Sequence, residues 1–300
     1  MPKISVIMPV HNESEHVLKT AINSILNQTY SDFELIIIND ASENNAEEVI
    51  LSYKDERIKY YKNETNLKVI KTLNRGLELA TCEYIARMDA DDIAFKTRFE
   101  KQVKVLDTHP EIGLVNTQCY IFPGKKLITP PEKHNDIEKI LKYSVNCIVH
   151  PAVMFRKSII EKNNLKYSEN HLHIEDYKMW IDMCDVTQLY TIPEALIMHR
   201  DWESSVSRKN ELEQQFNAQM LVFESILKDT QTFNEELLNT YKDFLHQNPI
   251  SVKKYIQIEK TLNIAKEKAI NEMSQTWFNY IYNVLEDMRN QFHSKVNFNL

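Results

Sequence analysis

Two apolar runs near the N-terminus flank a segment with helical periodicity. Residues 4–10 and 35–38 are nearly continuous runs of apolar, mostly β-branched side chains, which is typical of strands buried on both faces of a parallel sheet. Between them, apolar residues over 17–26 recur at helical spacing. Asn12 and Glu15 are predicted to form a capping box at the start of this helix. The pattern therefore predicts a β-α-β unit.

The alternation of strands and helices continues after this unit. Helices are predicted at 46–53 and 69–80, and strands at 57–61 and 84–88. Alternating elements of this kind predict an α/β fold in which a mostly parallel sheet carries helices on both faces. Ligands of such sheets bind beyond the carboxyl ends of the strands, so the polar residues that follow the strands are candidate site residues.

The second half of the chain is patterned less regularly and then becomes helical. The elements expected up to residue 207 are a helix over 99–106, strands over 112–122, 149–155 and 189–199, and a helix over 176–184. From about residue 208, apolar residues recur at helical spacing in long stretches without glycine, including 262–270 and 277–285. We therefore expect an α/β domain over 1–207 and a helical extension over 208–300.

Composition and charge exclude several classes of protein. A length of 300 residues with 43% hydrophobic and 26% charged residues is that of a globular chain with room for one large domain and an appendage. The three glycines, Gly76, Gly113 and Gly124, lie too far apart for the G-x-G-x-x-G or G-x-x-x-x-G-K-[ST] phosphate loops. A net charge of −7 is the wrong sign for a surface that binds nucleic acid, so nucleic acid is not expected as a partner.

Cysteine usage and hydropathy indicate a compartment. The four cysteines lie far apart and form no C-x-x-C pair, which is typical of reduced thiols in a cytoplasmic protein. The chain does not open with a basic segment followed by an apolar one, and no apolar run approaches the roughly 18 residues of a membrane span. We expect a cytoplasmic protein, and the sequence leaves peripheral docking on the inner face of the membrane open.

Three carboxylates crowd the end of the strand predicted at 84–88. Asp89, Asp91 and Asp92 lie within four residues, and such a cluster is costly to bury unless a cation offsets it. Mg²⁺ or Mn²⁺, held by carboxylates and substrate phosphates, explains the pattern. An acidic loop that caps the following helix explains it equally well, and these residues alone leave both interpretations open.

Several short segments, taken in order, resemble one known family. They are 9–13 (Pro-Val-His-Asn-Glu), 39–42 (Asn-Asp-Ala-Ser), 74–76 (Asn-Arg-Gly), 86–92 (Ala-Arg-Met-Asp-Ala-Asp-Asp), Asn146, 150–156 (His-Pro-Ala-Val-Met-Phe-Arg) and 174–180 (Ile-Glu-Asp-Tyr-Lys-Met-Trp). In this order and spacing they resemble family 2 glycosyltransferases of the GT-A fold. The resemblance covers roughly residues 3–207 and implies a nucleotide-binding half over 1–92 and an acceptor-binding and catalytic half over 93–207.

The resemblance implies a nucleotide-sugar donor site. Its residues would be Pro9, His11, Glu13, Asp40, Arg75, Arg87, Asp89, Asp91 and His150. Asp40 would contact the uracil or ribose, Asp89 the ribose side of the donor, and Asp91 would bind the divalent metal, Mn²⁺ or Mg²⁺, beneath the diphosphate. Arg75 and Arg87 either offset phosphate charge or are solvated or paired with carboxylates, and the sequence leaves both roles open.

The resemblance also implies the catalytic base. Attack at the anomeric carbon needs a carboxylate that takes the proton of the acceptor hydroxyl, and the family pattern assigns this role to Asp176, beside Glu175. A helix N-cap is the alternative role for Asp176. His150 either contacts a substrate or is a structural imidazole. Trp202 stands where many relatives carry a histidine, which puts a histidine role there in doubt.

Together these features predict a metal-dependent, inverting hexosyltransferase. It would move a sugar from a nucleotide-diphosphate donor, a UDP-sugar by preference, to a glycan or lipid-linked acceptor during synthesis of a surface polysaccharide such as lipopolysaccharide or capsule. A non-catalytic nucleotide-sugar-binding or assembly protein is the alternative. A nucleotidyltransferase would need a glycine-rich loop after the first strand, which 9–13 lacks. The helical extension is expected to handle acceptor, approach a membrane or form a homo-oligomer contact.

Overall fold

The computed structural model describes residues 2–124, 126–201, 210–246 and 252–270, with residues 283, 285–287 and 290. The chain divides into two compact units, Met1–Glu132 with Ile148–Ser205 and Lys133–Cys147 with Val206–Leu300. The longer segment of the second unit begins at residue 206, close to the boundary predicted from the sequence. The unit also includes residues 133–147, which the sequence grouped with the first domain.

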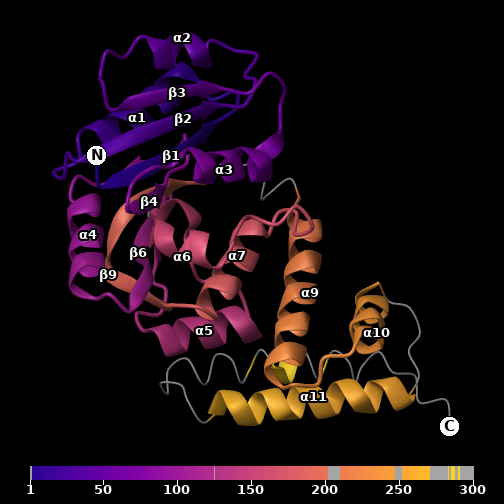
Figure 1. Ribbon diagram of the computed structural model, residues 1–300. Helices are drawn as coiled ribbons and strands as arrows, with labels where there is room; N and C mark the ends of the chain where they lie inside the picture. Colours follow the sequence, from indigo (N-terminus) through magenta and orange to yellow (C-terminus); the bar gives the residue numbers. More distant parts are fainter. Residues whose placement is uncertain are drawn as a thin grey trace. The chain divides into compact units, whose positions relative to one another are not determined.

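The first unit opens with the alternating elements that the sequence predicted (Figure 1). They are β1 (Ile4–Val10), α1 (Glu15–Leu26), β2 (Phe33–Asn39), α2 (Ala46–Leu51), β3 (Ile58–Lys62), α3 (Lys68–Leu79) and β4 (Tyr84–Arg87). β1 pairs in parallel with β2 and β4, and β2 with β3, so the carboxyl ends of these strands share one edge of the sheet. The predicted α/β fold is confirmed.

The remaining strands complete a nine-stranded mixed sheet in the order β3-β2-β1-β4-β8-β6-β9-β5, with β7 paired to β6. The further elements of this unit are β5 (Ile93–Ala94), α4 (Arg98–Thr108), β6 (Ile112–Phe122), β7 (Lys126–Ile128), the 3-10 turn η1 (His150–Ala152), β8 (Met154–Arg156), α6 (Lys157–Lys162), α7 (Glu175–Cys184) and β9 (Gln188–Arg200). In the register of β5 and β9, Ile93 pairs with Met198. The end of β9 therefore lies beside the residues that follow the acidic segment 89–92.

The side chains of β1 alternate between two helical layers. Ile4, Val6 and Met8 belong to the buried cluster that also contains apolar residues of α1 and α4. Ile7 faces the opposite layer, where a Cβ added at Gly76 of α3 would clash with the Cγ2 of Ile7. Glycine at this position lets α3 lie directly on the sheet, which fixes the helix whose first residues border the carboxyl edge.

The described part of the second unit is helical; the sequence predicted the helices after about residue 208 but not α5. Its elements are α5 (His134–Tyr143), α9 (Glu211–Asp229), α10 (Glu235–Leu245) and α11 (Val252–Ile270). Most of the apolar stripe predicted over 277–285 lies outside the described residues. None of the helices described here combines the length and apolar character needed to cross a bilayer.

The N-terminus of α1 is not formed by the predicted capping box. Ser14 is the N-cap residue, and it makes no side-chain cap hydrogen bond. Asn12 lies upstream in the left-handed region (φ 62°), where its Oδ1 accepts a hydrogen bond from the backbone N of Glu43 (2.8 Å). The side chain that was expected to cap the helix instead joins the loops that follow β1 and β2.

The strand predicted over 149–155 is also wrong in its first part. Residues His150–Ala152 form the turn η1, and only Met154–Arg156 pair with β4 and β6. Pro151 gives the physical reason, because a proline nitrogen has no hydrogen to donate to a strand ladder. As a result, His150 lies on a turn next to the sheet rather than within it.

Candidate active site

The loops after β1 and β2 lie side by side at the carboxyl edge of the sheet, as predicted. The backbone N of Asp40 donates to the carbonyl of Val10 (2.8 Å), and Nδ1 of His11 lies 2.9 Å from the carbonyl oxygen of Asp40. The backbone N of Asn12 donates to Oγ of Ser42 (3.0 Å). These bonds join the two loops into one wall that carries Pro9 and His11.

Glu13 lies within electrostatic reach of the acidic segment. Burial raises the pKa of Glu13, and the charge of Asp89 raises it further, whereas Arg200 and His11 act in the opposite direction. The structure therefore brings the residue after β1 together with residues that follow β4 and end β9.

Asp40 is a buried carboxylate that holds the entry to α3. It accepts hydrogen bonds from Nδ2 of Asn63 (2.6 Å) and from the backbone N of Leu67 (2.8 Å) and Lys68 (2.9 Å). Ala41 (φ 53°) and Lys68 (φ 69°) both adopt the left-handed conformation, which costs roughly 1–2 kcal/mol for a residue with a Cβ. Backbone strain of this kind concentrates at functional sites. A direct contact between Asp40 and the uracil or ribose stays a prediction.

The guanidinium of Arg75 is engaged at the end of β3. Its Nη1 donates to the carbonyl of Lys62 (2.9 Å) and to Oδ1 of Asn63. Because Asn63 in turn donates to Asp40, Arg75 supports the loop beneath that carboxylate, a role that the sequence did not predict. Its interaction with phosphate stays a prediction.

Arg87 and Asp89 form a pair at the end of β4. Nη2 of Arg87 lies 2.5 Å from Oδ1 of Asp89, and Arg87 is almost fully buried. Burial alone would raise the pKa of Asp89, but the charges of Arg87, His150 and His199 outweigh it and lower that pKa. Arg87 is therefore paired with a carboxylate, one of the two roles that the sequence left open, while its Nε has no partner among the described residues.

Asp92 is fully buried and bonded to the end of β9. It accepts hydrogen bonds from the backbone N of Arg200 (2.8 Å) and from Nδ1 of His199 (3.0 Å). Burial opposes the charge on His199, but the hydrogen bond and charge of Asp92 raise the pKa of His199 to about 9. Nε of Arg200 donates to the carbonyl of Asp91 (2.9 Å), so the strand end is bonded to two successive residues of the acidic segment.

The acidic segment offers a candidate metal group. Asp89, Asp92 and His199 each present a ligand atom, and these atoms lie within 4.8 Å of one another. Asp91, the predicted ligand, borders this group, and burial together with the charges of Asp89 and Asp92 raises its pKa to about 7. Carboxylate and imidazole donors suit Mn²⁺, and carboxylates suit Mg²⁺, so the residues fit the predicted cation. The sequence reasoning missed His199 as a member because the pairing of β9 beside the acidic segment is not visible in the pattern.

The two acidic residues that begin α7 differ in exposure. Ile174 is the N-cap residue, so the N-cap role considered for Asp176 is wrong. Asp176 is partly exposed in the first turn, where its Oδ1 accepts from the backbone N of Tyr177 (2.7 Å). Glu175 is buried, its Oε2 has no partner among the described residues, and burial raises its pKa. Of the pair, Asp176 is the more accessible to a substrate.

His150 lies against α7 and the loop before it. Its Nε2 is 3.1 Å from the hydroxyl of Tyr167, and its ring meets the edge of Trp180 with centroids 5.7 Å apart. Burial, followed by the charge of Arg87, lowers the pKa of His150 to about 3, so the imidazole is neutral at physiological pH. Trp180 is fully buried in the core, and Trp202 lies outside the described residues.

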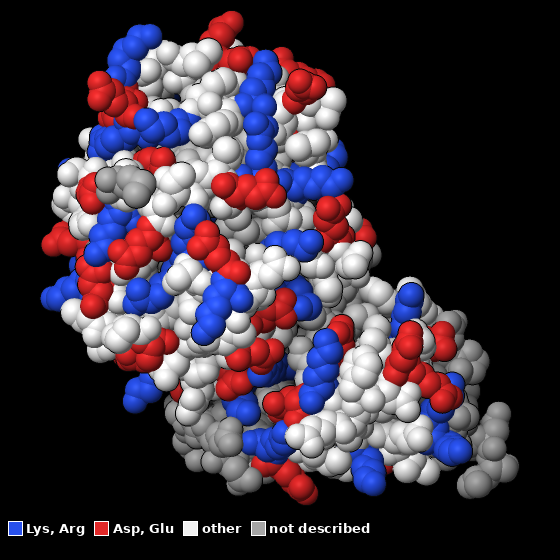
Figure 2. Space-filling model, in the orientation of Figure 1, with Lys and Arg blue, Asp and Glu red and all other residues white. Residues whose placement is uncertain are grey.

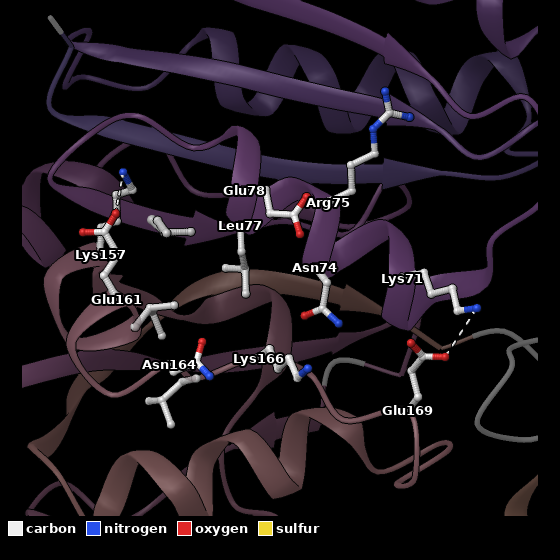
Figure 3. A pocket seen from close by; sticks show the side chains of 13 residues that line it. Lys71, Asn74, Arg75, Leu77, Glu78, Lys157, Glu161, Asn164, Lys166 and Glu169 are labelled. Carbon is white, nitrogen blue, oxygen red and sulfur yellow. Dashed lines mark ion pairs between the residues drawn. The ribbon is translucent and has the colours of Figure 1, made fainter.

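A cavity of about 550 Å³ lies apart from these carboxylates, between α3, α6 and the loop over 164–169 (Figure 3). Ion pairs join Lys71 to Glu169 (3.4 Å) and Lys157 to Glu161 (3.0 Å) along its wall. Acidic and basic side chains are similarly interspersed over the face of the molecule drawn in Figure 2. Of the predicted site residues, the lining of this cavity includes Arg75.

Comparison with known proteins identifies relatives over most of the first unit. The family described as Glycosyl transferase family 2 matches residues 5–163. An uncharacterised glycosyltransferase of Methanocaldococcus jannaschii is 40% identical over 60% of this chain, and the aligned part spans 64% of that protein. An O-antigen biosynthesis glycosyltransferase of Escherichia coli, WbnJ, is 34% identical over 68% of this chain and 82% of its own length.

Two solved structures resemble the fold at low sequence identity. S. aureus TarS 1–349 in complex with UDP-GlcNAc has a TM-score of 0.63 at 17% identity, covering 97% of this chain and 91% of that one. The mannosyltransferase PcManGT of Pyrobaculum calidifontis, in complex with GDP-Man and Mn²⁺, has a TM-score of 0.54 at 14% identity, covering 98% of this chain and 86% of that one. These likenesses confirm the GT-A-like fold with C-terminal helices.

Proposed function

Because the chain belongs to glycosyl transferase family 2, we propose that it transfers a hexosyl group from a UDP-sugar to a hydroxyl of a glycan or lipid-linked acceptor, with inversion at the anomeric carbon. The observation that carries the proposal is that the first unit holds two separate groups of acidic residues. Three follow β4, where like charges call for a cation, and two begin α7, where one is accessible to a substrate.

The joined loops after β1 and β2 support a nucleotide pocket. Pro9, His11 and Glu13 line one side of it, and the buried Asp40 holds the loop 63–68 on the other. Because a pocket with a fixed backbone orders little on binding, this network favours affinity for the donor. The UDP-GlcNAc complex of the S. aureus relative supports UDP as the nucleotide.

The acidic segment is suited to hold Mn²⁺ or Mg²⁺. Asp91 is the proposed ligand, with Asp89, Asp92 and His199 as the neighbouring donors, and His199 must lose its proton before it can coordinate. A bound divalent cation offsets the charge that develops on the departing diphosphate. The Mn²⁺ complex of the Pyrobaculum relative supports this assignment. Arg87, buried beside Asp89, adds a fixed positive charge next to the same segment.

Asp176 is the proposed general base. It is partly exposed, so its carboxylate can accept the proton of an acceptor hydroxyl as the hydroxyl attacks the anomeric carbon. Glu175 is buried beside it, and its Oε2 has no partner in the described part of the chain, so it is better suited to orient neighbouring groups than to meet the acceptor. The E. coli relative supports a surface polysaccharide as the product, and the proposed place of synthesis is the cytoplasm or its membrane face.

The proposal is tested by incubating the purified chain with UDP- and GDP-sugars, Mn²⁺ and a panel of hydroxyl acceptors. Release of the nucleoside diphosphate and the anomeric configuration of the product are measured. A product of inverted configuration that forms from a UDP-sugar and requires the metal supports the proposed metal-dependent, inverting transfer. A retained configuration contradicts the inverting mechanism, and binding of UDP without turnover of any donor favours a nucleotide-sugar-binding or assembly protein.

A further inference from the structure

Tyr167 is a buried residue that no motif of the sequence singles out. It lies in the loop between α6 and α7 and is only 2% exposed. Its backbone N donates to Oδ1 of Asn74 (2.9 Å), and Nδ2 of Asn74 donates to its carbonyl (2.8 Å). One amide side chain on α3 thus satisfies both backbone groups of Tyr167, so the loop before the catalytic helix is fixed to a helix of the nucleotide-binding half. Asn74 is labelled at the wall of the cavity in Figure 3.

The hydroxyl of Tyr167 holds one edge of His150. It lies 3.1 Å from Nε2 of the imidazole, and the two ring centroids are 5.5 Å apart. Trp180 also packs against the imidazole, in a T-shaped arrangement with ring centroids 5.7 Å apart. The rings of Tyr167 and Trp180 limit the rotation of His150. Nε2 is the hydrogen-bond partner of the Tyr167 hydroxyl among the described residues, and a buried hydroxyl needs an acceptor for its proton. With the hydroxyl as donor, Nε2 is unprotonated and Nδ1 carries the proton of the neutral imidazole.

Both halves of the proposed site act electrostatically on this cluster. Asp176, Glu175, Asp89 and Arg87 all act on the ionisation of Tyr167, and Arg87 and Asp89 act on that of His150. The Tyr167 and His150 pair therefore lies within electrostatic reach of both the acidic segment after β4 and the start of α7. A small error in the orientation of its polar groups would affect both the donor and the proposed base.

We infer that Tyr167 is a positioning residue, whose hydroxyl fixes the orientation and tautomer of His150 at the donor site and whose backbone is fixed by Asn74. The inference deepens the proposed function and rests on it for the role of His150 in turnover. The hydrogen bond contributes only if it acts through His150, because Tyr167 itself is too buried to meet a substrate.

A double-mutant cycle on the full chain tests the coupling. Tyr167→Phe keeps the packed ring and removes the hydroxyl, and we expect kcat/KM for the donor to fall about 5–10-fold. In a His150→Gln background, the same change should alter kcat/KM by less than about twofold, because its target is gone. Effects that multiply independently in the double variant would overturn the inference.

Tyr84→Phe is the matched control for the loss of a buried tyrosine hydroxyl. Tyr84 is 1% exposed and donates to Oδ1 of Asp107 (2.6 Å), without contact with His150. We expect it to lower the thermal midpoint as Tyr167→Phe does, while leaving kcat/KM within about twofold of the wild type. If Tyr84→Phe lost as much activity as Tyr167→Phe, lost stability would explain both results, and the positioning role would be contradicted.

A spectroscopic measurement decides the inference independently of turnover. Nitrogen NMR spectra of histidine-labelled chain distinguish the two neutral tautomers, and the signals of His150 are assigned by their loss in His150→Gln. We expect a single tautomer in the wild type and in Tyr84→Phe, and a mixture in Tyr167→Phe. An unchanged His150 spectrum in Tyr167→Phe would overturn the inference. Failure of the wild type to turn over any donor would instead count against the proposed function.

Discussion

Nδ1 of His199 lies 3.0 Å from Oδ2 of Asp92, although 107 residues separate them in the sequence. The contact joins the end of β9 to the acidic segment after β4, and Arg200 adds a backbone hydrogen bond to the same carboxylate (2.8 Å). A fully buried carboxylate is costly unless it is paired and hydrogen-bonded, and these two bonds supply that compensation. The end of β9 is therefore part of the candidate site as much as the end of β4 is.

The pairing makes the stability of the protein depend on pH through His199. The folded protein raises the pKa of His199 to about 9, from about 6.5 in an unfolded chain. A raised histidine pKa stabilises the fold fully below about pH 6.5 and loses that contribution as the pH rises to about 9. We expect the stability advantage of the wild type over His199→Gln to shrink by about 1 kcal/mol across this range, since a side chain 38% exposed is partly screened by solvent.

Urea denaturation in excess chelator at about pH 6 and about pH 9.5 measures this difference. His16→Gln, a change at an exposed histidine of α1, is the matched control and should show no comparable trend. An advantage of the wild type that grows as the pH rises would contradict the assignment of the proton to His199.

Asp91 is expected to lower the stability of the metal-free protein and to strengthen the binding of metal. Burial and the charges of Asp89 and Asp92 raise its pKa to about 7, so without metal Asp91 destabilises the fold increasingly as the pH rises from about 3.9, its pKa in an unfolded chain, to about 7. In chelator at about pH 8, Asp91→Asn should raise the free energy of unfolding by about 1–2 kcal/mol. This gain should be clearly smaller at about pH 5 and should vanish only below about pH 3.9, where Asp91 is protonated in the unfolded chain as well. With Mn²⁺, the variant should bind both metal and UDP more weakly.

Calorimetry measures the binding of Mn²⁺ and UDP, and denaturation at the two pH values measures the free energy of unfolding. Asp32→Asn replaces an exposed carboxylate before β2 and serves as the control. If UDP binds the wild type equally well in excess chelator, the metal assignment is wrong.

Substitution of Asp176 should lower the transfer rate, whereas substitution in the acidic segment should weaken the binding of metal and UDP. Asp176→Asn removes the proposed base and leaves the donor loops intact, so the transfer rate should fall by about 10²–10⁴ while UDP affinity hardly changes. Glu175→Gln should lower the transfer rate less, because Glu175 is buried and is not the proposed proton acceptor. Asp182→Asn, which breaks the ion pair with Lys178 on the same helix (2.5 Å), controls for loss of a carboxylate from α7.

Steady-state transfer and calorimetric UDP binding are measured for the three variants. Turnover of Asp176→Asn close to that of the wild type, with Glu175→Gln inactive, would move the base to Glu175. Turnover close to that of the wild type for both would leave the proposed mechanism without its base.

Local pattern predicted the order of elements in the first half of the chain because each element there is defined by its own periodicity. Residues 4–10 and 35–38 are apolar on both faces, and both become buried strands of the parallel sheet. The convergence of loops after β1, β2 and β4 follows from that order alone, since parallel strands end at one edge.

The parts that the sequence did not reveal depend on contacts between distant segments. The pairing of His199 with Asp92 requires the register of β9 beside β5, and no local pattern encodes it. Tyr167 lies in a loop without periodicity, and its role depends on Asn74, 93 residues away. The turn at His150 could have been predicted from the sequence, because Pro151 is a poor strand residue.

Helix α5 depends on helices that follow the boundary predicted at residue 207. Residues 133–147 group with 206–300, and the hydroxyl of Tyr143 donates to the carboxylate of Asp229 on α9. Ile137, Ile140 and Leu141 of α5 are buried. A chain that ends at residue 210 keeps every proposed donor residue but loses α9, so the apolar face of α5 loses the helix it contacts.

Truncation at residue 210 is therefore expected to lower stability without removing the donor pocket. Each buried aliphatic side chain contributes about 1.5–3 kcal/mol, so the loss of cover over α5 should cost several kcal/mol and create a surface that binds a hydrophobic dye. Replacing Ile137 and Leu141 by glutamine in the same truncated chain should reduce dye binding and aggregation, because the exposed face is then polar. Calorimetry should find UDP binding with Mn²⁺ in this polar version, since the donor residues lie in the other unit. A folded version that does not bind UDP would show that the helices after residue 210 contribute to the donor site.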